Sequence, residues 1–171
     1  MWLLAGIADW WCHRKADIEH TSGFPESALH LLMLGEAAVP VLAGLFLEIS
    51  PPVLLLMAGA FIVHEATALW DVTLASKRRV VSPIEQHVHS FLEMIPLMAL
   101  AFVAVLHWPQ VSSIFGMRGR TADWSIRWKR QKLPATYIGS LLAAIVILEW
   151  MPYLEEAWRT SHPRKARPLR F

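Results

Sequence analysis

The sequence is poor in cysteine and in charged residues. Its single cysteine, Cys12, excludes an intrachain disulfide and any CxxC motif for metal binding or redox chemistry. Charged residues make up 18% of the 171 residues, whereas hydrophobic residues make up 55% and gather in long runs. The sequence contains no internal repeat and no low-complexity segment. A soluble domain of this size is rarely so apolar, so we predict a small polytopic membrane protein with one compact domain.

The apolar runs are bounded by prolines and polar turns, which indicate where helices begin and end. The start of the chain lacks the basic region of a signal peptide, and we expect it to belong to the first helix. We predict an all-α fold: an antiparallel four-helix bundle with a polar metal-site core, plus a fifth transmembrane helix. The predicted helices span residues 2–20, 25–48, 53–76, 83–107 and 134–150.

Two basic segments are expected outside these helices. Residues 109–133 hold Trp124 and Trp128 among basic residues, which is typical of an interfacial loop at a membrane surface. Residues 159–171 form a basic tail after a single integral-membrane domain that spans residues 1–158. Ten of the 16 basic residues would lie on the side where helix one ends and helix two begins, which favours the cytoplasm for that side. In a prokaryote, the membrane would be the bacterial inner membrane.

The most unusual stretch lies near the end of the third predicted helix. His64, Glu65 and Asp71 occupy positions where residues that face hydrocarbon would be expected. Ionisable groups inside a membrane span are costly and mark functional sites by default. His64 and Asp71 are seven residues apart, so they share one helix face at about 10 Å along the axis. A zinc-protease HExxH motif is excluded, because position 68 is Ala68.

Other ionisable residues lie at helix ends that are predicted to meet on one side of the membrane. Short turns make neighbouring helices antiparallel, so the end of helix one, the start of two, the end of three and the start of four lie together. At a rise of about 1.5 Å per residue, their polar side chains fall into two layers. The shallower layer would hold His13, Asp17, His30, Asp71 and His89, and the deeper one Asp9, Glu36, His64, Glu65 and Glu93.

This density of imidazoles and carboxylates predicts metal ions. Any single histidine–acid pair could instead be an interhelical hydrogen bond. About ten such groups on four converging faces, however, would be very costly without metal ions, protons or water. Their chemistry suits iron, zinc or manganese, and the size of the set favours two ions, with iron the expected metal. The predicted ligands are His13, Asp17, His30, His64, Asp71, His89 and Glu93, with Glu65 and Glu93 as candidate catalytic groups.

In its inventory of ligands, the chain resembles the membrane histidine-rich di-iron enzymes, the fatty-acid desaturases and hydroxylases. The nearest counterparts to their histidine boxes are the stretch from His13 to His20, the lone His64, and His87-x-His89. None of these reproduces a box, so no residue is assigned by motif. The resemblance implies oxygen-dependent hydroxylation or desaturation of a lipid or other apolar substrate, with an electron-donor protein as a partner.

Three other functions would use the same residues. A zinc-dependent membrane hydrolase would take the same ligands, with Glu65 or Glu93 as the base. A metal or proton transporter would need polar access from both sides, whereas the far halves of helices two to four are apolar. The many carboxylates disfavour a haem held by two histidines. Nucleic-acid binding is not expected, because the basic segment between two predicted spans is better explained by contact with lipid headgroups.

Overall fold

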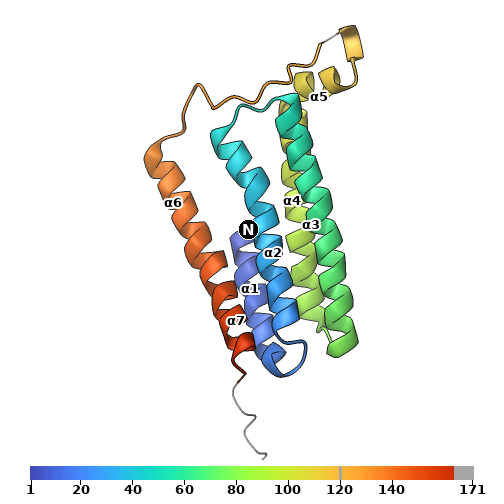
Figure 1. The fold of residues 1–171 in the computed structure, drawn as a ribbon, viewed down its shortest axis with the longest axis vertical. Helices are drawn as coiled ribbons and strands as arrows, with labels where there is room; N and C mark the ends of the chain where they lie inside the picture. The colour runs from blue at the N-terminus through green and yellow to red at the C-terminus, as the bar shows by residue number, and fades with distance from the viewer. Residues whose placement is uncertain (120, 164–171) are drawn as a thin grey trace, which may run out of the picture.

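The structure is a computed structural model that describes residues 1–119 and 121–163. The described part of the chain is helical, with one isolated β-bridge between Leu47 and Trp128 and no β-strand. Figure 1 shows the long helices side by side, with α5 and the loop after it at one end. The helices are α1 (Trp2–Lys15), α2 (Phe24–Phe46), α3 (Pro51–Arg78), α4 (Pro83–Leu106), α5 (Trp108–Ile114), α6 (Ala135–Ile145), a π-helical turn (Val146–Trp150) and α7 (Met151–Ser161), with short 3₁₀ turns at Ile18–His20 and Met117–Gly119.

Four helices are long and apolar enough to cross a membrane. They are α2, α3, α4 and the continuous helix Ala135–Ser161, which joins α6, the π-helical turn and α7. Prolines at the first or second helical position start α2, α3 and α4, where the missing N–H is tolerated. The all-helical class and membrane-spanning character predicted from the sequence are therefore supported by four spans.

Two helix ends differ from the sequence prediction by more than two residues. The first helix ends at Lys15 rather than at residue 20, because Asp17 adopts a left-handed backbone conformation with φ of 52° that an α-helix cannot continue. With 14 residues, α1 is shorter than a membrane crossing requires. The last helix continues past the predicted end at Trp150 as far as Ser161. The predicted tail lies outside the described residues from position 164 onward.

The short helix α1 packs against its neighbours along the face that carries Asp9 and His13. It packs against α4, the π-helical turn and α7, while α2 packs against α3 and α7. Its first residue lies about halfway along the neighbouring helices in Figure 1. At the opposite end from the α1–α2 turn, the predicted interfacial loop crosses the α2–α3 turn, where the Glu48 N–H donates to the Arg127 carbonyl at 2.9 Å and the Lys129 N–H to the Phe46 carbonyl at 2.8 Å.

A buried arginine ties three helix ends together. Arg79, directly after α3, donates to Glu26 in the first turn of α2 at 2.5 Å and also to Glu85 in the first turn of α4. The three side chains are 3%, 0% and 1% exposed. Burial lowers the pKa of the Arg79 guanidinium, but its hydrogen bonds to Glu85 and Glu26 outweigh burial and raise that pKa above its usual value. Arg79 therefore stays charged and neutralises part of the charge of two buried carboxylates.

Replacing this arginine should destabilise the fold strongly. In Arg79→Gln, two buried carboxylates lose their cation, and breaking a buried ion pair typically costs about 3–5 kcal/mol. Thermal unfolding in detergent micelles measures the effect as a large fall in Tm. The control is Arg127→Gln, which removes an exposed pair with Asp123 at 3.3 Å and should cost less than about 1 kcal/mol. Similar Tm values for the two variants would contradict the assigned role of Arg79.

Candidate metal centre

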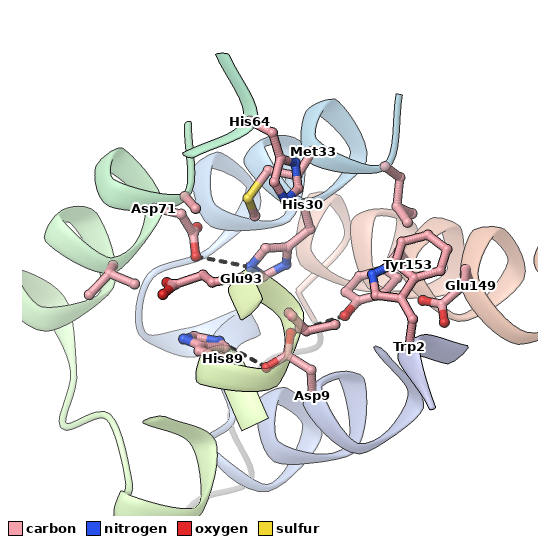
Figure 2. A pocket seen from close by; sticks show the side chains of 14 residues that line it. Trp2, Asp9, His30, Met33, His64, Asp71, His89, Glu93, Glu149 and Tyr153 are labelled. Carbon is pink, nitrogen blue, oxygen red and sulfur yellow. Dashed lines mark hydrogen bonds and ion pairs between the residues drawn. The ribbon is translucent and has the colours of Figure 1, made fainter. Parts of the chain in front are cut away.

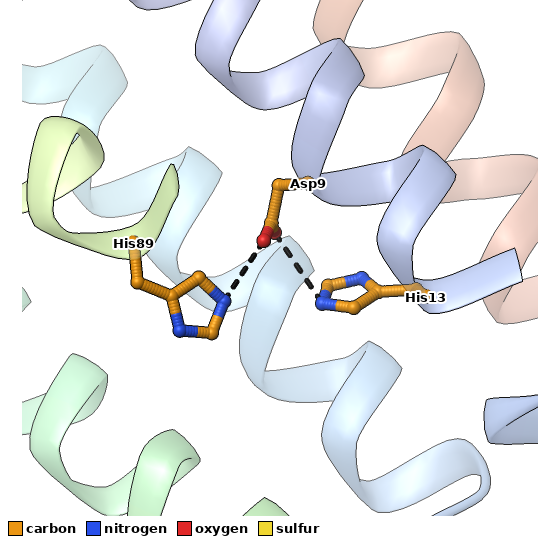
Figure 3. A group of neighbouring side chains, drawn as sticks. All are labelled: Asp9, His13 and His89. Atoms are coloured by element: carbon orange, nitrogen blue, oxygen red, sulfur yellow. Dashed lines mark ion pairs between the residues drawn. The ribbon is translucent and has the colours of Figure 1, made fainter. Parts of the chain in front are cut away.

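Asp9 links two histidines from different helices. Asp9 and His13 are one turn apart on α1, with 3.4 Å between Asp9 Oδ2 and His13 Nε2. From α4, His89 brings its Nε2 to 2.8 Å from Asp9 Oδ1. Figure 3 shows the two imidazoles on either side of this carboxylate. The sequence spacing explains the first contact, because residues four apart share a helix face.

His30 on α2 lies directly against His13. The two rings are stacked, with centroids 4.4 Å apart and planes within 4° of parallel. Asp71 on α3 faces the outer edge of His30, with 3.5 Å between Asp71 Oδ2 and His30 Nε2. Figure 2 shows Asp71, His30, His89 and Asp9 around one small space. Four helix segments that are distant in the sequence therefore contribute to one cluster.

Glu156 on α7 orients both stacked rings. Its Oε2 lies 3.0 Å from His13 Nδ1, and its Oε1 lies 2.7 Å from His30 Nδ1. The carboxylate is fully buried. An ionised carboxylate only accepts hydrogen bonds. Each Nδ1 therefore carries a hydrogen and donates a hydrogen bond to Glu156. With Nδ1 held by Glu156, Nε2 of each ring points away from Glu156, and in a neutral ring this atom keeps the lone pair that a metal ion would bind. A carboxylate that holds the far nitrogen of an imidazole is typical of metal-binding histidines.

The atoms opposite Glu156 lack protein partners. His13 Nε2, His30 Nε2 and Asp71 Oδ1 are buried and make no hydrogen bond. The nearest acceptors to the two Nε2 atoms are carboxylate oxygens at 3.4 to 3.6 Å, beyond ordinary hydrogen-bond distance. Buried polar atoms are nearly always satisfied in proteins, so a group of buried ligand atoms without protein partners around one space is an arrangement that could hold a metal ion. Within the described residues, Asp9, His13 and His89 have ligand atoms within 4.8 Å of one another, and so do Glu26, His30 and Asp71.

Two further residues of the last helix support the cluster. The Tyr153 hydroxyl lies 3.0 Å from Asp9 Oδ2, to which it donates, and 3.1 Å from the Gly6 carbonyl. Glu149 lies in the π-helical turn and is buried against α1 at Gly6. A Cβ on Gly6 would meet Glu149 Oε2 at 2.0 Å, so only glycine allows this close approach. π-Helical turns inside α-helices occur frequently at functional sites.

The structure brings four of the seven predicted ligands together. These four ligands are His13, His30, Asp71 and His89. We call them, together with Asp9 and Glu156, the histidine–carboxylate centre. This centre adjoins a cavity of about 70 Å³.

The other predicted residues lie at or beyond its edge. His64 and Glu93 line the same cavity, and the nearest acid to His64 is Glu36, whose Oε2 lies 3.6 Å from His64 Nδ1. Glu65 is not among the lining residues of the cavity, although its Oε1 is buried without a hydrogen bond. Asp17 is exposed after the end of α1, where it contacts His20 at 2.8 Å.

The contribution of the last helix was not predicted from the sequence. The fifth predicted helix ends at residue 150 and was interpreted as a membrane-spanning helix outside the polar four-helix bundle. In the structure Pro152 sits in the first turn of α7, where proline is tolerated. Glu149, Tyr153 and Glu156 have the spacing i, i+4, i+7 of one helix face. This spacing of polar residues is the sequence signal that would have predicted a contribution of the fifth helix to the site.

The donor set defines the chemistry that the centre can support. Three imidazole nitrogens and two aspartates suit iron, manganese or zinc better than magnesium or calcium, which prefer oxygen ligands alone. A scan against protein-family models found no matching family, and searches of curated proteins and of solved structures found no match. The assignment of the site therefore rests on its own geometry.

Removing the charge of Glu156 should weaken metal binding. In Glu156→Gln, one side chain can no longer accept from both Nδ1 atoms, and changes of this kind typically lower metal affinity about 10–100-fold. Elemental analysis of the purified variant after dialysis against a weak chelator measures the loss. The matched control is Glu155→Gln, because Glu155 is half-exposed and its Oε2 accepts from the Trp10 indole at 3.1 Å. Equal metal content in the two variants would show that Glu156 does not support a metal site.

Proposed function

We propose that the protein is an integral-membrane oxidoreductase that holds two metal ions, with iron as the expected metal. The observation that carries the proposal is a set of buried, unpartnered atoms: Nε2 of the two histidines that Glu156 orients, and Oδ1 of Asp71. Asp9, His13 and His89 would hold one ion, and His30 with Asp71 the other. Glu26 shares the second group, but its carboxylate is engaged by Arg79. Two such ions would supply the activation of oxygen.

The position of the centre supports an apolar substrate. A second cavity of about 350 Å³ lies between α2, α3 and α4 and shares His64 and Trp2 with the cavity beside the centre. Apart from Glu36 and His64, its lining residues are apolar or small. We call this second cavity the apolar chamber. A substrate from the bilayer could lie in it without exposing the centre to bulk water, as an oxidation of a lipid requires.

A zinc-dependent hydrolase is the second candidate. Glu93 lines the same cavity as His30, Asp71 and His89, where a general base for hydrolysis would lie. Zinc takes the same ligands and would lower the pKa of a bound water toward about 7. For either reaction we propose that the α1–α2 end of the protein faces the cytoplasm, because Arg14, Lys15 and the basic residues at the end of α3 lie there.

Elemental analysis of the purified protein tests the proposal and separates the two candidates. Iron near two equivalents, with an optical or Mössbauer spectrum of a coupled pair, supports the oxidoreductase, whereas stoichiometric zinc without iron supports the hydrolase. His89→Ala should lose at least half of the metal, because it removes an imidazole from the first group. The control His87→Ala removes an exposed histidine from the same helix and should leave the content unchanged. Protein without bound metal after expression in metal-supplemented medium would refute both candidates.

A further inference from the structure

The apolar chamber lies in the half of the bundle that is opposite to the histidine–carboxylate centre. Its lining begins at Glu36 and His64, near the middle of α2 and α3, and runs to Leu45 beside the end of α2 and to Met57 in the second turn of α3. From Glu36 to Leu45 the helix rises about 14 Å, close to half of a hydrocarbon core of about 30 Å. The chamber therefore spans one leaflet, from the middle of the membrane to the surface at the α2–α3 turn.

The length of α1 explains why this half of the bundle is hollow. α1 has 14 residues and begins about halfway along its neighbours in Figure 1. Its first helical residue, Trp2, lines the near end of the chamber, and no later residue of α1 lines it. The helix α6 does not fill the space either, because none of its residues is buried and none is among the described residues that line the chamber. The far halves of α2, α3 and α4 thus lack the neighbour that α1 provides in the near half.

Hydrocarbon from the bilayer is the material that suits this space. The chamber has a volume of about 350 Å³, and its far end is lined by Leu45, Met57 and Val103, which offer no hydrogen-bonding side chain. Water gains no partner there. An empty chamber would leave the lining side chains without dispersion contacts on one side. An acyl chain supplies these contacts, while its methylenes only exchange one apolar environment for another.

The direction of the chamber selects the leaflet. A lipid whose headgroup lies at the α2–α3 turn has its acyl chain directed toward the midplane, which is the direction of the chamber. A lipid of the leaflet beside the histidine–carboxylate centre has the opposite direction and reaches only the midplane with its methyl end. In the chamber, the methyl end of the first lipid lies beside Trp2 and His64, which also line the cavity next to the centre.

A lysine at the outer end of the chamber favours an anionic headgroup. Lys129 lies in the loop that crosses the α2–α3 turn, and its half-buried ammonium donates to the carbonyl of Gly44, a lining residue of the chamber. An ammonium has three donors, so two remain for another acceptor. Glu48, the acid of this turn, accepts from the Arg130 N–H at 2.7 Å. A basic residue at a membrane surface favours anionic lipid about fivefold.

We propose that the apolar chamber binds one acyl chain of an anionic phospholipid from the leaflet at the α2–α3 turn, with the headgroup beside Lys129 and the methyl end beside His64. The inference rests on the proposed function only in naming this chain as the substrate, because the binding itself requires no metal. For an oxidoreductase, it places the methyl-terminal part of the chain, rather than the carbons next to the ester, nearest to the centre.

Photo-crosslinking in nanodiscs of phosphatidylglycerol tests the orientation. One probe carries a diazirine at the last carbons of an acyl chain, and the other carries it near the carboxyl group of that chain. The terminal diazirine should label His64 or Ile95, and the proximal one Leu45 or Met57, as read by peptide mass spectrometry. The reversed pattern, or labels confined to outward-facing residues such as Phe102, would overturn the proposal.

A variant that fills the outer end of the chamber tests the location. Gly44 lines the chamber, and a Cβ there would meet Met57 Cε at 3.5 Å, an ordinary contact. Gly44→Leu should remove most of the labelling of His64 by the terminal diazirine, because the leucine occupies the space through which the chain passes. The matched control is Gly59→Leu on α3, which adds the same side chain at an exposed position with open space around it. Equal labelling of His64 in the two variants would overturn the proposal.

A charge variant tests the choice of headgroup. Phosphatidylglycerol should label the chamber about fivefold more strongly than phosphatidylcholine with the same chains. Lys129→Gln removes the charge but keeps a donor for the Gly44 carbonyl, and it should abolish this preference. The control Lys132→Gln removes the same charge from an exposed position of the same loop and should retain the preference. Equal labelling by the two lipids in the native chain, or equal preference in the two variants, would overturn the assignment of an anionic lipid.

A second pair of variants guards against misfolding of Gly44→Leu. Ala60→Leu also fills the chamber, and Ala66→Leu adds the same bulk at an exposed position of the same helix. Thermal unfolding and metal content are measured on every variant. Bound metal without chamber labelling in the native chain refutes the inference alone. Chamber labelling in a native chain that binds no metal refutes the proposed function alone.

Discussion

The centre depends on one carboxylate that accepts hydrogen bonds from two imidazoles. Glu156 holds His13 and His30 by their Nδ1 atoms, and the two rings lie stacked within 4° of parallel. Hydrogen bonds to a charged group contribute about 1.5–3 kcal/mol each, enough to fix both tautomers and both ring positions. The Nε2 atoms then point together toward Asp9 and Asp71. Without Glu156 the same histidines could rotate to satisfy their nitrogens elsewhere, and no preformed set of ligand atoms would exist.

The buried charges around this interaction favour the binding of cations. Six carboxylic acids are buried in the described part of the chain, and Arg79 compensates the two at the helix ends. Glu156 is satisfied by two imidazoles, which leaves Asp9, Asp71 and Glu149. Asp9 faces His13 Nε2 and Asp71 faces His30 Nε2 at distances beyond a hydrogen bond. Opposed lone pairs repel unless a proton or a metal ion lies between them. The buried acids are Asp9, Glu26, Asp71, Glu85, Glu149 and Glu156.

Hydropathy and helix periodicity predicted the long helices and four residues of the centre. The positions of Asp17 and Glu156 depend on local backbone geometry that these patterns do not show. Apolar runs bounded by proline predicted the bounds of α2, α3 and α4 to within a few residues. Antiparallel packing of neighbouring helices predicted that four of the ligands, His13, His30, Asp71 and His89, lie close together. Asp17 was assigned to the same stripe because the helical period was extended past Lys15. Its left-handed backbone ends α1 and turns the side chain to the surface. Glu156 was missed because the fifth helix was predicted to end at residue 150, six residues before it, whereas the helix continues through the π-helical turn to Ser161.

The two cavities divide the membrane-spanning region by polarity. The centre lies toward the helix ends, where water and headgroups reduce the penalty for ionised groups. The chamber lies deeper, where an apolar lining avoids that penalty. Trp2 at the start of α1 and His64 on α3 line both cavities and mark the boundary between them.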